Sequence, residues 1–253
     1  AGGELILSSM ECLESSQFLQ NGCALYANEY FTTTGGVAYL EGDLLAEGVV
    51  TGMDGENLIG GDSRIFSDYV NDGTTAVHRG TLYIFGDLSG EGTMLGDVDD
   101  GPGLRGGDLP SPGDGFAIGG SSSLGPKASL RMLEFDWTLG IGGDVDWAID
   151  DPSRFGMSGA TLSLTGLDTG LQSLELMSPD RGAVETTDFQ LGTLRIEPGT
   201  VVTLVDTHDN VGDGDAACEA IYADTIVVEH GATLLTNGCP VYARETIIKG
   251  ELD

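Results

Sequence analysis

Basic residues are scarce in this chain of 253 residues. It holds 2 Lys and 8 Arg against 41 acidic residues, so its formal net charge is −31 at pH 7. A chain with so large an excess of negative charge repels polyanions. The composition therefore excludes nucleic acid as a partner, and it disfavours an enzyme that acts on an acidic polysaccharide.

Long hydrophobic runs are missing as well. No apolar run approaches the about 20 residues that a membrane-spanning helix needs, so we expect no membrane insertion. Hydrophobic residues still make up 40% of the chain, and apolar positions alternate along it, which argues against disorder. With 41 glycines to supply turns, the composition is typical of an acidic β-protein with one domain or two small ones.

Catalytic signatures are few. The three histidines are His78, His208 and His230, and no Gly-x-Ser-x-Gly motif occurs. His208 lies in a polar segment where metal binding is conceivable, and His230 lies in a Glu-His-Gly turn that we expect to face solvent. Carboxylate pairs arise by chance among 41 acids, and none stands out. We therefore expect this chain not to be an enzyme.

The strongest positive signal is internal repetition. Residues 21–29 read Asn-Gly-Cys-Ala-Leu-Tyr-Ala-Asn-Glu, and residues 237–245 read Asn-Gly-Cys-Pro-Val-Tyr-Ala-Arg-Glu, with six of nine positions identical. A third Tyr-Ala pair at Tyr222 precedes Tyr242 by 20 residues. That spacing suits one coil of a β-solenoid, in which short strands are joined by turns.

A second repeat has a spacing of 32 residues. Residues 193–200 align with residues 225–232, and in both an alternating strand is followed by a glycine turn. The pattern apolar-x-Gly-acidic-Leu also recurs at 40–44, 84–88 and 248–252. We expect its glycine to adopt the positive φ of a tight corner, with the flanking apolar residues pointing inward.

These repeats predict an all-β fold, a parallel β-helix with an elaborated middle. The expected divisions are N-terminal coils at 1–48, a loop-rich β insertion at 49–158 with a long loop at 96–125, and C-terminal coils at 159–253, in one continuous domain. A β-sandwich or jelly roll is the alternative, although neither repeats whole motifs. A short helix is expected only between Met10 and Gln20.

The four cysteines form two local pairs in the sequence. Cys12 and Cys23 lie near the start, and Cys218 and Cys239 lie near the end. Four cysteines allow three connectivities, of which we favour Cys12–Cys23 with Cys218–Cys239. Four buried free thiols are the alternative, and neither spacing is typical of a zinc site.

Calcium is the ligand that the acidic turns favour. Hard cations bind clustered oxygen atoms on glycine-rich turns, although neither acidic segment here matches an EF-hand. Solvated turns without a metal are the alternative. The candidate ligands are Asp97, Asp99, Asp209, Asp213 and Asp215.

Residues 191–253 carry a family resemblance. The segments 191–200 (Leu-Gly-Thr-Leu-Arg-Ile-Glu-Pro-Gly-Thr), 221–238 and 241–244 (Val-Tyr-Ala-Arg) resemble a recurring module of large exported bacterial repeat proteins. The resemblance implies a parallel β-helix in an extracellular or cell-surface protein, and it implies no catalytic residue. A chain that begins at Ala1 is also what removal of a signal peptide would leave.

Repeat-like sequence reaches both ends of the chain. Gly3-Glu4-Leu5 matches Gly250-Glu251-Leu252, and Ile247 and Ile248 lie just before the latter. The end coils of a β-helix expose strand edges, which another copy can cover head to tail. We therefore expect a self-assembling subunit of a filament, sheath or surface layer.

The alternative is a secreted adhesin or carbohydrate-binding module. Trp137 and Trp147 lie beside the long loop and could stack on an extracellular glycan, unless both are core residues.

Overall fold

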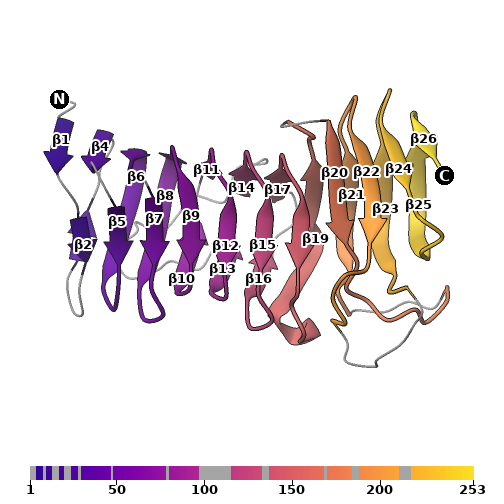
Figure 1. Cartoon of the computed structure of the whole chain (residues 1–253), viewed down its shortest axis with the longest axis horizontal. Coiled ribbons are helices and arrows are strands. Elements are labelled where there is room, and N and C mark those ends of the chain that lie inside the picture. The colour runs from indigo at the N-terminus through magenta and orange to yellow at the C-terminus, as the bar shows by residue number, and fades with distance from the viewer. Residues whose placement is uncertain are drawn as a thin grey trace.

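The chain folds into a parallel β-helix, in which each strand pairs in parallel with the equivalent strands of the coils before and after it. The computed structural model describes residues 4–7, 10–12, 17–19, 24–27, 30–46, 48–77, 80–96, 115–132, 137–167, 170–183, 188–210 and 218–253. Figure 1 shows the stack from the side, with the two termini at opposite ends. A sandwich or jelly roll is thereby excluded.

One sheet forms a single face of the stack, which we call the third face because it comes last in each coil. Its eleven strands are β2 (Met10–Cys12), β5 (Tyr30–Thr33), β7 (Gly48–Thr51), β9 (Asp68–Asn71), β12 (Leu88–Gly90), β15 (Ser122–Leu124), β18 (Val145–Trp147), β20 (Leu171–Glu175), β22 (Val201–Val205), β24 (Thr233–Leu235) and β26 (Glu251–Leu252).

The second, fifteen-stranded sheet covers the other two faces. The first face holds β3 (Gln17–Leu19), β10 (Thr74–Val77), β13 (Thr93–Gly96) and β16 (Ser129–Met132). The second face holds β1 (Glu4–Leu7), β4 (Ala24–Ala27), β11 (Thr81–Ile84), β14 (Gly115–Ile118) and β17 (Thr138–Ile141). Six long strands contribute to both faces: β6 (Val37–Leu45), β8 (Glu56–Ile65), β19 (Phe155–Leu164), β21 (Leu191–Ile196), β23 (Ile221–Val228) and β25 (Val241–Ile248).

Strand β8 illustrates how a long strand serves two faces. Its residues 56–59 pair with β10, whereas its residues 63–65 pair with β11. The two strands β10 and β11 follow one another in the same coil, so the two halves of β8 lie on different faces of the stack.

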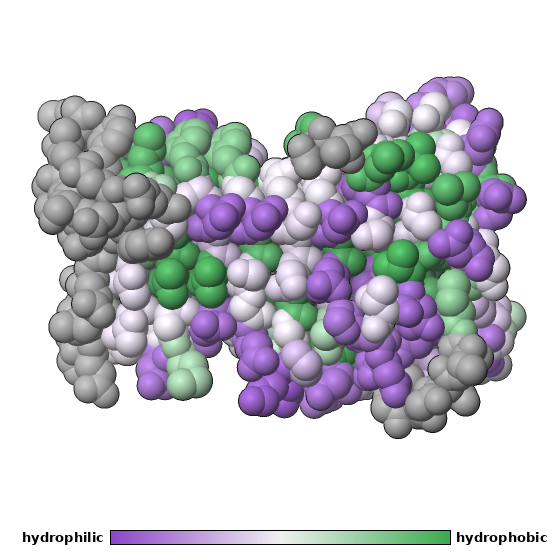
Figure 2. Space-filling model, viewed as in Figure 1, coloured by the Kyte–Doolittle hydropathy of each residue, from purple (hydrophilic) through white to green (hydrophobic). Residues whose placement is uncertain are grey.

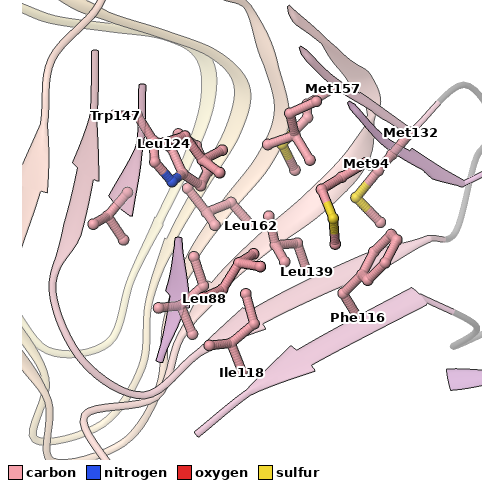
Figure 3. Close-up of a cluster of buried hydrophobic side chains, with 14 of the residues drawn as sticks. Leu88, Met94, Phe116, Ile118, Leu124, Met132, Leu139, Trp147, Met157 and Leu162 are labelled. Carbon is pink, nitrogen blue, oxygen red and sulfur yellow. The ribbon is translucent and has the colours of Figure 1, made fainter. Parts of the chain in front are cut away.

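Inward-pointing side chains fill the stack from coil to coil. Because side chains alternate along a strand, every second residue points inward, and the buried ones form one continuous hydrophobic core. Figure 3 shows Leu, Ile, Met and Phe side chains of successive coils packed together, with Trp147 among them. Fully burying such a side chain is worth about 1.5–3 kcal/mol, so the column of coils is the main source of stability.

The strand registers explain two of the sequence repeats. Tyr222 pairs with Tyr242, and Thr193 pairs with Thr225, so the spacings of 20 and 32 residues each correspond to one coil. The prediction of a solenoid with coils of variable length is confirmed.

The apolar-x-Gly-acidic-Leu pattern has a different explanation. Gly42 lies inside β6 and has a positive φ of 121°, whereas Gly86 and Gly250 lie at another corner, between the second and third faces, and are not among the glycines with positive φ. The expected positive φ is therefore wrong for these two. A Cβ at Gly86 would lie 2.6 Å from the backbone nitrogen of Asp68 in the preceding coil, so close packing of neighbouring coils requires glycine there.

The middle of the chain continues the same stack. The described part of residues 49–158 supplies strands from β7 to β18, which pair with the coils on both sides. Residues 97–114 of the expected loop lie outside the described residues, while β14 and β15 occupy most of 115–125, which is therefore not loop.

The expected helix at Met10–Gln20 is wrong, because the described residues there form β2 and β3. In the described parts of the chain the one helical element is a 3-10 turn, η1 (Pro152–Arg154), capped by Asp151. Pairing of these strands with β5 and β6 outweighs the local pattern that suggested a helix.

Hydrogen bonds between side chain and backbone connect successive coils at the corner before the third face. Oδ1 of Asp68 accepts the backbone N–H of Asp87 at 3.0 Å, and Oδ1 of Asp87 accepts that of Ser121 at 2.7 Å. The series continues as Oγ of Ser121 accepts from Asp144 and Oδ1 of Asp144 accepts from Ser173. We call these five residues the corner ladder; it satisfies backbone N–H groups near the beginning of the third-face strands.

Candidate functional site

The last coil exposes residues whose register partners in the preceding coils are buried. Ile248 continues a column of inward-pointing residues of the second face and is 41% exposed, whereas the preceding members are at most 2% exposed. Those members are Ile84, Ile118, Ile141, Leu164, Ile196 and Val228. Leu252 is 47% exposed, although its neighbour Leu234 in the preceding coil is fully buried. This end of the stack therefore exposes apolar side chains of the kind that the preceding coils bury.

The strands of both end coils are paired on one side only. In the described residues β25 pairs with β23 and β26 with β24, while β1 pairs with β4 and β2 with β5. Their outer edges present backbone N–H and C=O groups that can pair with another strand.

The register relates the two ends to each other. Leu5 pairs with Leu25, and the column continues through Leu44 and Ile65 to reach Ile248 at the far end. Glu4 begins the adjacent column, which ends at Ile247, itself 38% exposed. Two copies stacked in continuous register would therefore bring Glu4 and Leu5 of one beside Ile247 and Ile248 of the other.

The matching motifs at the two ends do not occupy matching positions. Strand β4, in the first Asn-Gly-Cys repeat, lies on the second face, whereas the later copy begins β25 on the first face. Glu4-Leu5 likewise lies on the second face, and Glu251-Leu252 on the third. Gly3 lies outside the described residues, and Gly250 packs against the backbone of Glu229 and Ala232.

Charged residues tie the last coil to the preceding one. Nζ of Lys249 donates to Oε2 of Glu229 at 2.8 Å, and Arg195 binds the other carboxylate oxygen. The hydrogen bond from Lys249 is the main reason why the pKa of Glu229 lies below its ordinary value. Glu245, Glu251 and Asp253 in the same coil are exposed, so the apolar end is rimmed by negative charge.

The structure contains one of the two disulfides that we favour. Cys218 and Cys239 are bonded, with their Cα atoms 5.3 Å apart. Cys12 lies in β2, and Cys23 lies outside the described residues, so their pairing stays a prediction.

Four of the five candidate calcium ligands lie outside the described residues: Asp97, Asp99, Asp213 and Asp215. The fifth, Asp209, is exposed. In the part of the chain that the structure describes, no three His, Cys, Asp or Glu side chains are grouped closely enough to hold a metal ion.

Two of the three histidines, His208 and His230, lie in the described residues. Nε2 of His208 lies 2.7 Å from Oδ1 of Asp146, and the backbone N–H of His208 donates to the buried carboxylate of Glu175. These contacts fasten the segment after β22 onto the third face. His230 is exposed on its turn, as expected, and His78 lies outside the described residues.

The two tryptophans do not form a binding platform. Trp137 and Trp147 are both buried, and Nε1 of Trp147 donates to Oγ of Ser122 at 3.0 Å. The alternative in which they stack on a glycan is therefore wrong.

Sequence reasoning missed an exposed aromatic pair, Phe66 and Phe85, whose rings stack outside the core. Each follows the last residue of a second-face strand, and the two are 19 residues apart, which is one coil in this region. This spacing of one coil is the sequence signal that could have indicated the stacked pair.

Comparisons with protein-family models, with curated proteins and with solved structures give no match. Among the described residues no helix has the length and apolar character needed to cross a membrane.

Proposed function

We propose that this chain is a subunit of an extracellular structural assembly, a filament, sheath or surface layer, in which copies stack head to tail. The observation that carries the proposal is the exposure of Ile248 and Leu252 at the end of otherwise buried columns. A second copy that places β1 and β2 against β25 and β26 would cover these side chains and pair the open strand edges.

Strand pairing would supply the larger part of the binding energy. Covering the exposed parts of Ile248 and Leu252 contributes roughly 1 kcal/mol each, since full burial of such a side chain is worth about 1.5–3 kcal/mol. Each added backbone hydrogen bond contributes about 0.5–1.5 kcal/mol net. Association itself costs about 4 kcal/mol or more. The two side chains alone cannot overcome that cost. The open strand edges of the second and third faces must therefore also pair with those of the next copy.

Electrostatics should make the assembly depend on salt. A net charge of −31 on each copy, together with exposed Glu245, Glu251 and Asp253 at the rim, opposes contact between copies. Added salt screens this repulsion, and calcium would relieve it more strongly by binding carboxylates. We therefore propose calcium as a cation that favours assembly.

The proposed location is outside the cell. The disulfide between Cys218 and Cys239 is typical of proteins that work in oxidising compartments. The resemblance of residues 191–253 to exported bacterial repeat proteins supports the same location.

Sedimentation and negative-stain electron microscopy of the purified chain test this function. We expect particles that grow along one axis as the protein concentration, salt or calcium rises. Ile248→Asp places a charge in the proposed contact and should shift assembly to at least tenfold higher concentration. Met53→Asp is the matched control, because Met53 is 84% exposed on a turn between strands of the first and third faces.

Circular dichroism establishes that both variants keep the β-helix. A wild-type chain that stays monomeric under all these conditions would overturn the proposal. So would an Ile248→Asp variant that assembles as readily as the Met53→Asp control.

A further inference from the structure

Phe66 and Phe85 form a stacked aromatic pair, the Phe pair, on the corner between the second and third faces. Their ring centroids are 4.7 Å apart and their planes differ by 2°, and the side chains are 43% and 55% exposed. One face of the Phe85 ring is covered by Phe66. The opposite face points along the stack toward the next coil.

Among the described residues, the next two coils place glycine at the positions beside that open ring face. The backbone N–H of Gly119 bonds to Ile84, and that of Gly142 bonds to Ile118, so these glycines continue the positions of Phe66 and Phe85. Leu167 then stands near Gly142 and closes the far end. In Figure 2 hydrophobic residues gather along the upper edge in the coils of β8 and β11, and the outline falls at the coil of β14. The result is a shallow hollow with an aromatic wall and a glycine floor.

A carboxylate borders this floor. Oδ1 of Asp87 lies so close to Gly120 that a side chain there would collide with it, and the Asp87 side chain is exposed. Asp68 occupies the equivalent place one coil earlier. The nearby cation Arg64 is already ion-paired with Asp43 at 3.2 Å. The hollow therefore combines a ring face with the carboxylate of Asp87, which has no ion pair with a described basic residue.

We propose that this hollow binds the guanidinium group of an arginine side chain presented by a basic protein partner. The coil spacing of about 4.8 Å leaves room over Gly119 for one planar group parallel to the Phe85 ring. A guanidinium group fits that space, is attracted by the ring face, and can donate hydrogen bonds to Asp87. The net charge of −31 attracts a basic partner from a distance.

The other stacked pair does not share these properties. Tyr222 and Tyr242 also stack, but the Tyr222 hydroxyl donates to the carbonyl of Gly182, and the Tyr242 hydroxyl donates to Asp180 at 2.8 Å. Tyr222 is buried by the segment that these hydrogen bonds hold in place. The Tyr pair therefore serves the fold, and the Phe pair is the open one.

Fluorescence anisotropy with a labelled Gly-Arg-Gly-Arg-Gly peptide tests the proposal on the full chain. The comparison peptide replaces each arginine with citrulline, which keeps the shape and removes the charge. Phe85→Leu keeps an apolar side chain without a ring, and we expect it to weaken binding by about two- to thirtyfold. Asp87→Asn removes the charge but keeps the oxygen that accepts from Ser121, and it should also weaken binding severalfold.

Met53→Leu is the control variant and should bind the arginine peptide like the wild type. Equal binding of the citrulline and arginine peptides would overturn the proposal, because the site would then be merely apolar. Equal binding by wild type and Phe85→Leu would overturn it too, because attraction would come from net charge alone. Since the Phe pair lies far from β25 and β26 along the stack (Figure 1), both results are independent of head-to-tail assembly.

Discussion

Replacing Tyr69 with Phe tests a chain of polar groups inside the stack. The Tyr69 hydroxyl is bonded to Nδ2 of Asn57 at 2.9 Å, to Oγ1 of Thr51 at 2.6 Å and to Oγ1 of Thr75. All four residues are fully buried. Burial raises the pKa of the Tyr69 hydroxyl, which therefore stays protonated and can act as donor and acceptor at once.

The expected loss follows from the groups that the substitution leaves behind. Asn57 keeps a bond to Thr51 at 2.6 Å and Thr75 keeps one to Asn71 at 3.2 Å, so these partners are weakened rather than isolated. Leaving buried polar groups partly unsatisfied costs about 1–3 kcal/mol. At about 2–4 °C per kcal/mol for a chain of this size, the melting temperature should fall by roughly 2–12 °C.

Urea unfolding followed by circular dichroism measures this loss on the intact chain. Tyr83→Phe is the matched control, because Tyr83 lies on the outward side of β11 and is only half-buried. We expect the control to change the unfolding midpoint little. A Tyr69→Phe variant as stable as the control would refute the reasoning, since the buried hydroxyl would then contribute nothing beyond the ring.

Two further predictions concern the C-terminal coils. Replacing Cys218 and Cys239 together with Ser should lower the free energy of unfolding by about 3 kcal/mol, since the disulfide closes a loop of about 20 residues; equal melting temperatures with and without a reducing agent would contradict this. The lowered pKa of Glu229 means that its pairing with Lys249 stabilises the fold above the ordinary value of 4.5 and is lost as the pH falls through the lowered pKa. The difference in melting temperature between wild type and Lys249→Gln should therefore be constant above pH 4.5 and vanish in stronger acid. A difference that persists in strong acid would exclude the ion pair as its cause.

The fold was predictable because each coil repeats a chemical pattern. Leu194 and Ile226 occupy the same register position, and so do Ile196 and Val228, since one inward column demands an apolar residue at the same place in every coil. The apolar-x-Gly-acidic-Leu pattern gave a wrong prediction of positive φ at Gly86 and Gly250, because glycine serves two different needs in this fold. At Gly42 it allows a positive φ, and at Gly86 it allows two backbones to approach closely.

The candidate site was only partly predictable. The sequence indicated that Ile248 and Leu252 lie in the last repeat, but their exposure depends on what covers them in space. The likeness between Glu4-Leu5 and Glu251-Leu252 suggested equivalent positions, whereas these segments lie on different faces. A motif of three residues indicates only a turn followed by the beginning of a strand. Because each coil has more than one such corner, the motif does not identify the face.

The corner ladder gives the acidic composition a structural meaning. Asp68, Asp87 and Asp144 each accept a backbone N–H from the following coil, so part of the acidic composition is needed by the coils themselves. These side chains are exposed and repeat along the stack, and they place negative charge along its length. Like charges on the flanks oppose sideways association, while the apolar side chains of Ile248 and Leu252 are concentrated at one end. The flank charge therefore favours contact along the axis over contact between flanks, and it would also draw a basic partner to the exposed pair of Phe66 and Phe85.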